Sequence, residues 1–317
     1  MLTNRALHVD TLLTDISIAY KNADYIADQI FPVVPVRKQS DKIPAYDQSY
    51  WFRNEAALRA PGTKSVRGGY KVDTSAAYYC NRFSFAHEIP DELRDNADVV
   101  FNLDREAVEY VSDKVQMRRE ASFAADFFTT SVWGADKTGG TDFTRWSDYG
   151  ASDPLVDLAD YQELIEGQIG RTPNTLVLGR QVWTKLKWHP VMVDLVKHTR
   201  IGGPITLDAF RDMAEFERLL VGKAIYTASP EGTAEASVTY SRIWGKHGLM
   251  AYIAPRPSLM TPSAGYTFVW DRPGSGLQYI KRFRDEEREV DIFEANTYFD
   301  QKVTAARAGI FISGAVA

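Results

Sequence analysis

Residues 102–128 form a long segment without glycine or proline, and this segment most constrains how the chain can fold. Asn102 is a favourable N-cap residue, so a helix can begin directly after it. Apolar residues such as Val111 and Val115 share one half of the helical wheel, and polar residues such as Glu120 share the other half. A helix of this length measures about 40 Å. It is longer than a small domain requires, and we expect it to lie across the protein as a strut.

The overall composition is that of a folded protein. The chain has 317 residues, enough for about two packed units, with 44% hydrophobic and 25% charged residues. These values exclude wholesale disorder. The net charge of −5 provides no general basic field for tight binding of nucleic acid. The one cysteine, Cys80, excludes an intramolecular disulfide framework, and we expect it to be a small buried residue.

Targeting signals are not evident in the sequence. The chain contains no run of about 18 apolar residues, which is the length that indicates a membrane span. The first residues lack the uninterrupted apolar core of a signal peptide. We therefore expect a soluble protein that folds in the cytoplasm.

The N-terminal region is predicted to be an arm. Apolar residues recur at steps of three and four between Leu12 and Ile30, which indicates an amphipathic helix. Two prolines in residues 31–36 then favour extended backbone. A helix followed by such a segment, without core sequence nearby, suggests an arm that reaches away from the body.

Residues 37–77 are rich in charge, glycine and proline and contain only short apolar runs. Short pieces near residues 45–53 and 70–74 have strand-like composition. A loop of this length is uncommon in a compact domain and is usually either functional or disordered. We interpret it as a long β-hairpin-like excursion that needs neighbouring chains to bury it. The alternative is a flexible loop that is sensitive to proteolysis.

Aromatic residues make up 12% of the chain, and many lie in segments that are otherwise rich in turns and charge. The segment Tyr50-Trp51-Phe52-Arg53 is an example. Amphipathic aromatic side chains suit surfaces that become buried between chains. For any single residue, a place in the core of an irregular α+β fold is the alternative, but the set as a whole favours extensive subunit contacts.

The remaining sequence predicts a mixture of helices and strands, and hence an α+β protein. Helices are expected at residues 155–169, 180–188, 190–198 and 206–216. Strands are expected at residues 78–89, 172–179, 219–227, 237–244, 249–254, 266–271, 278–285, 290–299 and 305–312.

Motifs for catalysis or cofactor binding are not found. The sequence has no phosphate-binding P-loop, dinucleotide fingerprint or nucleophile elbow. The histidines are scattered, and we expect them to be surface or structural residues: His8, His87, His189, His198 and His247. The acidic run at residues 285–291 could hold a divalent cation. A solvated turn paired with Lys281, Arg282, Arg284 and Arg288 is the favoured interpretation.

The predicted elements occur in a distinctive order: an arm, a long extended loop, one long helix and a mixed α/β body. Specific stretches support this order, namely residues 30–36, 52–53, 59–62, 68–70, 86–98, 118–120, 126–130, 145–154, 174–179 and 186–190. Together, over essentially the whole chain, they resemble the major capsid proteins of tailed bacteriophages, which have the Hong Kong 97 type fold.

This resemblance implies a division of the chain into parts. It implies an N-terminal arm (1–36), an extended loop overlying a neighbouring subunit (37–77), a peripheral domain (78–154) with a spine helix (102–128), an axial domain (155–289), and strands returning to the peripheral domain (290–317).

The implied function is structural: self-assembly through pentamers and hexamers into the icosahedral shell that encloses a double-stranded DNA genome. No catalytic, cofactor-binding or metal-binding residue is expected. The residues implied as assembly contacts are Phe31, Tyr50, Trp51, Phe52, Arg53, Arg59, Tyr70, Trp133 and Trp146.

The resemblance also implies partners. Arm-like sequence begins almost at Met1, without the long scaffolding segment of some family members, so a separate scaffolding protein is expected. A portal, possible decoration proteins and non-specific contact with packaged DNA are further expectations, with assembly in the host cytoplasm. Lys42, Lys64 and Lys71 lie in the loop, but no partner residues for covalent cross-linking can be matched.

Two other interpretations remain open at this point. A cellular compartment shell of the encapsulin type has the same fold but encloses cargo protein instead of DNA. An unrelated enzyme or binding module with an inserted loop would be a compact monomer or small oligomer, and the exposed aromatic arm and hairpin argue against it.

Overall fold

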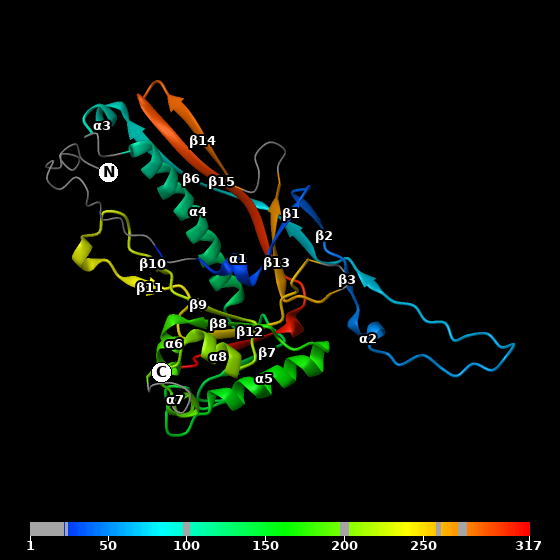
Figure 1. Cartoon of the computed structure of the whole chain (residues 1–317). Helices are drawn as coiled ribbons and strands as arrows, with labels where there is room; N and C mark the ends of the chain where they lie inside the picture. Colours follow the sequence, from blue (N-terminus) through cyan, green and yellow to red (C-terminus); the bar gives the residue numbers. More distant parts are fainter. Residues whose placement is uncertain (1–21, 23–24, 98–101, 197–202, 258–260, 272–277) are drawn as a thin grey trace.

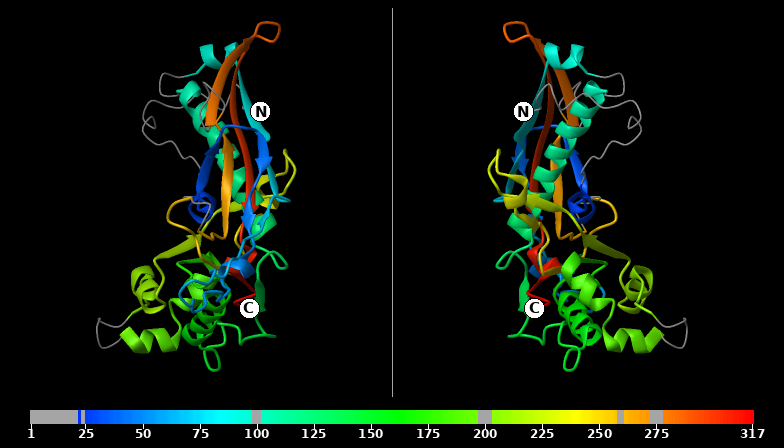
Figure 2. Two further views of the ribbon diagram at one scale, coloured as in Figure 1. Left: turned by 90° about the vertical axis from the view of Figure 1, so that its right-hand side faces the viewer. Right: turned by 90° about the vertical axis from the view of Figure 1, so that its left-hand side faces the viewer.

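A computed structural model describes residues 22, 25–97, 102–196, 203–257, 261–271 and 278–317 (Figure 1). The protein is elongated, with two β-sheets at opposite ends. A long helix runs along the upper sheet, several helices surround the lower sheet, and a thin loop projects to one side (Figures 1 and 2). No helix within the described ranges combines the length and apolar character needed to cross a bilayer.

The upper sheet is organised around its longest strand, β15 (Val290–Val303). β14 (Gln278–Asp285) and β13 (Gly265–Trp270) pair with β15 in antiparallel register, and β6 (Asn81–Pro90) pairs antiparallel with its other edge. β1 (Val33–Val36) adds to β13 in parallel. The short helix α3 (Asp91–Asp95) follows β6 at the tip of the sheet.

Helix α4 (Leu103–Phe127) packs along β15 and β6 and confirms the predicted helix at residues 102–128. The Asn102 side chain accepts a hydrogen bond from the backbone N–H of Arg105, as the cap prediction requires. Ala107, Val111 and Val115 are buried against the sheet. The apolar stripe of the helix therefore fixes α4 on the sheet.

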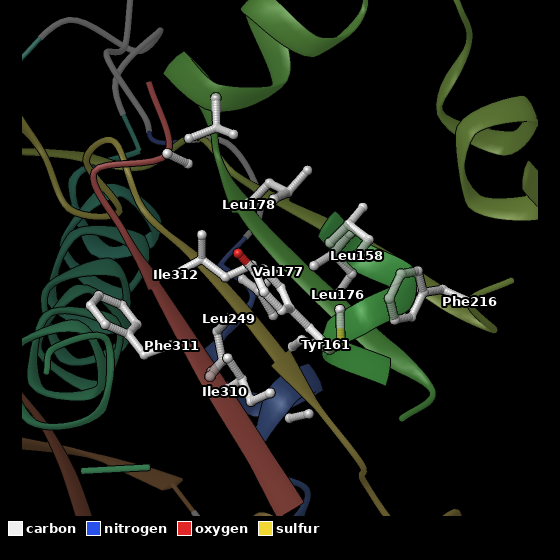
Figure 3. Close-up of a cluster of buried hydrophobic side chains, with 14 of the residues drawn as sticks. Leu158, Tyr161, Leu176, Val177, Leu178, Phe216, Leu249, Ile310, Phe311 and Ile312 are labelled. Carbon is white, nitrogen blue, oxygen red and sulfur yellow. The ribbon is translucent and has the colours of Figure 1, made fainter. Parts of the chain in front are cut away.

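The lower sheet has the strand order β7 (Ala135–Thr138), β16 (Gly309–Ser313), β12 (Gly248–Ala251), β8 (Thr175–Gly179) and β9 (Arg218–Gly222). Four helices lie around it: α5 (Pro154–Ile169), α6 (Arg180–Leu186), α7 (Pro190–Val196) and α8 (Leu207–Met213). Its core brings aliphatic side chains of β8, β12 and β16 against Leu158 and Tyr161 of α5 (Figure 3).

Helix α5 has clear local signals at both ends. The Asp153 side chain accepts hydrogen bonds from the backbone N–H groups of Leu155 and Val156, and Pro154 occupies the first turn, where a missing N–H costs nothing. Gly170 ends the helix with a φ of +65°, a left-handed conformation that favours glycine. The helix predicted at 155–169 is thus confirmed.

Three small ribbons complete the fold. β2 (Ser40–Lys42) pairs with β5 (Ala77–Tyr79), and β3 (Ala45–Tyr46) pairs with β4 (Val72–Asp73). The short helix α2 (Gln48–Trp51) follows β3. β10 (Ile225–Thr227) pairs with β11 (Tyr240–Arg242). The described residues also include the 3-10 turns η3 (Glu235–Ser237) and η4 (Ala306–Ala308).

The N-terminal prediction is tested only in its described part. Of the helix expected from Leu12 to Ile30, the described residues contain α1 (Ala27–Ile30), while residues 12–21 and 23–24 lie outside the described residues. The following segment does not reach away from the body, because β1 belongs to the upper sheet and Ile30 and Phe31 are buried. The prolines do enforce extended backbone, but that backbone pairs with β13 of the same chain.

Membership of the two sheets does not follow the order of the sequence. β13 and β14 lie in the upper sheet with α4, although residues 155–289 were expected to form a separate axial domain. Residues 290–317 were expected to return to the peripheral domain: β15 lies in the upper sheet with α4, and β16 is an interior strand of the lower sheet. In both cases the strand was predicted correctly, but sheet membership depends on pairing with segments far away in the sequence.

Candidate assembly surfaces

The extended loop leaves the upper sheet as the two ribbons β2–β5 and β3–β4 and then projects beyond the rest of the protein (Figure 1). Residues 53–71 are all exposed, and this segment is called the loop tip below. Leu58 has the side chain of a core residue but is fully exposed, and Val66 is exposed as well. Apolar side chains in such positions indicate a surface that another chain covers.

An aromatic cluster lies where the loop tip begins and ends. The rings of Tyr46, Trp51 and Tyr70 have centroids 5.8–6.0 Å apart. The Arg53 guanidinium lies 4.5 Å from the ring centroid of Tyr50, a cation–π distance. Trp51 and Tyr70 remain more than half exposed. The cluster therefore stiffens the base of the loop while leaving aromatic area accessible.

Helix α2 attaches this base to the C-terminal end of α5. The Gln48 side-chain amide donates a hydrogen bond to the Gln168 carbonyl, and Arg307 donates to the Gln48 carbonyl oxygen at 3.5 Å. The Phe52 ring covers Gly170 so closely that a Cβ there would lie 3.3 Å from it. These contacts fix the direction in which the loop leaves the protein.

Glu120 of α4 holds the N-terminal segment, although the helical wheel placed it on the polar half. Its carboxylate is buried and accepts hydrogen bonds from the backbone N–H groups of Ile26 and Ala27, at 3.0 and 2.8 Å, and from the Trp244 indole at 2.7 Å. Burial raises the pKa of this carboxyl group above its ordinary value, and the three donors oppose that rise. No local pattern marks a glutamate that binds distant backbone.

Further contacts tie the same segment to α4 and to the β10–β11 ribbon. The Tyr25 hydroxyl donates to Asp113 at 2.9 Å, and Arg119 pairs with Asp28 at 2.7 Å. The Asn22 side chain donates to the carbonyl of Ile225 and accepts from its backbone N–H. From Asn22 onward, the described part of the arm is therefore held by its own chain.

Three of the predicted contact residues are core residues in this structure. Phe31 is fully buried, with its ring 4.8 Å from that of Phe123 and 6.2 Å from that of Trp133. Trp133 is also buried, and so is Trp146, whose indole donates to Asp157 at 2.9 Å. Their side chains have almost no accessible surface for a neighbouring chain to contact. For these three residues, the alternative of a place in the core of the fold applies.

The acidic run at 285–291 forms the end of β14, a turn and the start of β15 at the tip of the upper sheet, and several of its charges are paired. Arg282 and Arg94 each lie 2.9 Å from the Asp291 carboxylate. Arg284 binds Asp91, and this guanidinium holds the pKa of Asp91 below its ordinary value. The interpretation as a charge-paired turn is confirmed in part. Arg282 and Arg284 pair with Asp291 and Glu286 of the run, whereas Arg288 pairs with Glu88 of β6. Among the described residues, Lys281 has no ion-pair partner.

His189 is a buried structural histidine. Its Nε2 lies 3.0 Å from the Ser152 hydroxyl, and the Tyr149 ring packs across it. Burial lowers the pKa of the imidazole. Both Ser152 and His189 are buried, which agrees with a structural role for this histidine. Cys80 is buried as predicted.

No protein-family model matches the chain. Two curated relatives, however, match almost all of it. The major capsid protein of Burkholderia phage BcepMu is 28% identical over 313 residues, which cover 96% of each chain. The major capsid protein of Pseudomonas phage JBD67 is 30% identical over 335 aligned positions, which cover 100% of each chain. The chain belongs to the major capsid proteins of tailed phages.

Solved structures place this capsid protein in the Hong Kong 97 type fold. A phage-related protein from Bordetella bronchiseptica RB50 superposes with a TM-score of 0.71 at 26% identity over 97% of both chains. The capsid of cyanophage P-SCSP1u gives a TM-score of 0.64 at 12% identity, over 98% of this chain and 93% of that one. The capsid protein therefore has a shell-forming, structural role in the virion.

An encapsulin from Synechococcus elongatus PCC 7942 shares the fold with the capsid protein. The TM-score is 0.53 at 8% identity, over 97% of this chain and 95% of that one. An identity this low demonstrates a common fold and carries no information about cargo. The two phage relatives, by contrast, match the capsid protein in sequence along its length.

Proposed function

We propose that this capsid protein assembles through pentamers and hexamers into an icosahedral shell that encloses double-stranded DNA. The observation that carries the proposal is the loop tip, because residues 53–71 expose apolar and basic side chains that their own chain does not cover. Such a segment gains its stabilisation when an adjacent copy buries it. The proposed contact residues are Tyr50, Trp51, Phe52, Arg53, Arg59 and Tyr70.

The two sheets suggest how the parts correspond to the family's domains. We assign the upper sheet with α4 as the peripheral domain and the lower sheet with α5 to α8 as the axial domain that packs around five-fold and six-fold axes. The assignment rests on strand pairing instead of position in the sequence. Under this proposal, the two domains are defined by the two sheets and no longer by the sequence ranges 155–289 and 290–317.

Further partners follow from the same proposal. We expect a separate scaffolding protein, a portal, possible decoration proteins, and assembly in the host cytoplasm. Packaged DNA would contact the inner surface without sequence preference, because a chain with a net charge of −5 offers no general basic field and the sequence no cluster for base readout.

Negative-stain electron microscopy tests the proposal directly. The purified chain is examined after expression alone and after co-expression with neighbouring phage genes. We expect closed angular shells, or rings of five and six subunits. Nuclease-protected DNA in shells isolated from infected cells supports the virus, whereas a protein cargo supports the encapsulin-type compartment. A uniform small particle under every condition contradicts both.

A further inference from the structure

The β10–β11 ribbon, residues 225–242, is incompletely covered by its own chain. Within the described ranges, β10 and β11 pair only with each other, and every residue of the two strands is exposed. Tyr226 is 41% exposed and Tyr240 is 64% exposed. A two-stranded ribbon is at best marginally stable without further packing. Its aromatic side chains therefore indicate a partner that covers it.

The turn of this ribbon is acidic. Residues 228–239 contain two acidic side chains, Glu231 and Glu235, and no basic one, so the turn carries a net charge of −2. Both glutamates are exposed, and neither forms an ion pair with a described residue. A partner that fits this surface should be basic and should also carry apolar side chains.

The loop tip has this composition. Residues 53–71 contain five basic side chains and one acidic one, for a net charge of +4. Lys64, Arg67 and Lys71 form no ion pair with any described residue. Leu58 and Val66 add exposed apolar area on the same segment. The positive charge of the loop tip is complementary to the negative charge of the ribbon turn, and both surfaces expose apolar or aromatic side chains.

The two surfaces lie on opposite sides of the protein. The ribbon projects on the left in Figure 1, and the loop tip projects on the right. In the left-hand view of Figure 2, the side that carries the loop faces the viewer. One copy therefore cannot join its own two surfaces. Adjacent copies in a ring can, because a head-to-tail interface uses two different surfaces and closes by rotation.

We propose that the β10–β11 ribbon is the receptor for the loop tip of the adjacent copy. Glu231 and Glu235 pair with basic side chains of that loop, and Tyr226 and Tyr240 cover its apolar side chains. The inference rests on the proposed shell function and names the surface on which each loop binds. The acidic tip of the upper sheet is a weaker candidate, because Asp291, Asp91 and Glu88 there are already paired with arginines. The two glutamates of its turn that form no ion pair with a described residue, Glu287 and Glu289, flank Arg288.

A charge-swap experiment tests the pairing. The double variant E231R/E235R should lower the yield of shells at least about tenfold, because like charges then meet at the contact. The variant R59E/R67E should do the same. Combining all four substitutions should restore shells to near the unmodified yield. A control with Glu92→Arg and Asp95→Arg on α3 makes the same change in net charge at exposed positions outside the axial domain and outside both proposed surfaces.

Cysteine cross-linking tests for direct contact. Thr233→Cys on the ribbon turn is combined in turn with cysteines at positions 60, 63 and 66 of the loop tip, while the native Cys80 is buried. After oxidation, shells should give a ladder of dimers and higher oligomers on non-reducing gels. The single-cysteine variants should not give this ladder.

The outcomes separate this inference from the proposed function. If the unmodified chain forms no shells or rings, the proposed function fails and the inference fails with it. If the unmodified chain does form shells, two results overturn the inference alone. One is normal assembly of E231R/E235R, and the other is the absence of both charge rescue and a cross-linked ladder.

Discussion

At the scale of single residues, Glu120 determines where the N-terminal segment lies. A carboxylate buried among Phe123, Trp244 and Ile26 is unfavourable unless its oxygens are satisfied, and here three donors satisfy them. The three donors in turn depend on this carboxylate. Without it, two backbone N–H groups and the Trp244 indole N–H are buried with no hydrogen-bond acceptor.

Replacing Glu120 with alanine should destabilise the unassembled chain by about 3 kcal/mol, because buried donors lose their acceptor and a cavity is left. Urea unfolding of the unassembled subunit measures the change. Glu109→Ala is the matched control on the exposed face of α4 and should change stability by less than about 0.5 kcal/mol. Equal effects of the two substitutions would contradict the assigned role.

The pH dependence of stability provides a second test of Glu120. Its folded-state pKa is raised above the ordinary value, so the folded chain binds this proton more tightly than the unfolded chain. The contribution to stability is therefore greatest below the unfolded pKa and declines as pH rises through the folded pKa. Glu120→Gln does not titrate. The stability of the unmodified chain relative to Glu120→Gln should therefore fall as pH rises above the unfolded-state pKa of about 4.3.

The aromatic residues show what composition can and cannot predict. Trp51 and Phe52 lie in a segment of charge and turns and are exposed, in agreement with the sequence pattern. Trp133 and Trp146 lie in similar sequence but are buried, because residues far away in the chain pack over them. Burial of a tryptophan in irregular sequence depends on these distant partners, which no local pattern encodes.

At the scale of elements, helices with local end signals were predicted well. α4 and α5 have side-chain caps, apolar periodicity and, for α5, a terminal glycine, all of which can be recognised within a few residues. β7 was missed, because four residues of mixed polarity become a strand only by pairing with β16. Sheet membership in general requires knowledge of the tertiary partner.

Val111→Asp on α4 should prevent folding. The side chain is fully buried against Ala295 of β15, and an unpaired carboxylate there costs more than about 3 kcal/mol. Circular dichroism and urea unfolding of the purified subunit measure the loss. Gln116→Asp, an exposed position on the same helix, should keep the unmodified unfolding midpoint. A cooperative, unmodified transition for Val111→Asp would mean that the buried stripe of α4 is assigned incorrectly.

At the scale of the whole molecule, we expect the extended loop to be needed for assembly but not for folding of the two sheets. The loop tip makes few contacts with the two sheets, so its removal should leave the body intact. Replacing residues 55–68 with a short Gly-Ser linker keeps α2 and the β3–β4 ribbon. The variant should retain the melting temperature of the unassembled chain but form no closed shells in electron micrographs. Intact shells would show that the loop is dispensable for assembly.

The position of β16 within the lower sheet has a consequence during synthesis. β16 lies between β7 and β12, yet the ribosome makes it about 130 residues after β8. Until then, β7 has no partner in the sheet and β12 lacks one neighbour. A nascent or prematurely terminated chain therefore cannot close the lower core. We expect incomplete chains to be sensitive to proteolysis and unable to join a growing shell, because their lower sheet is not closed.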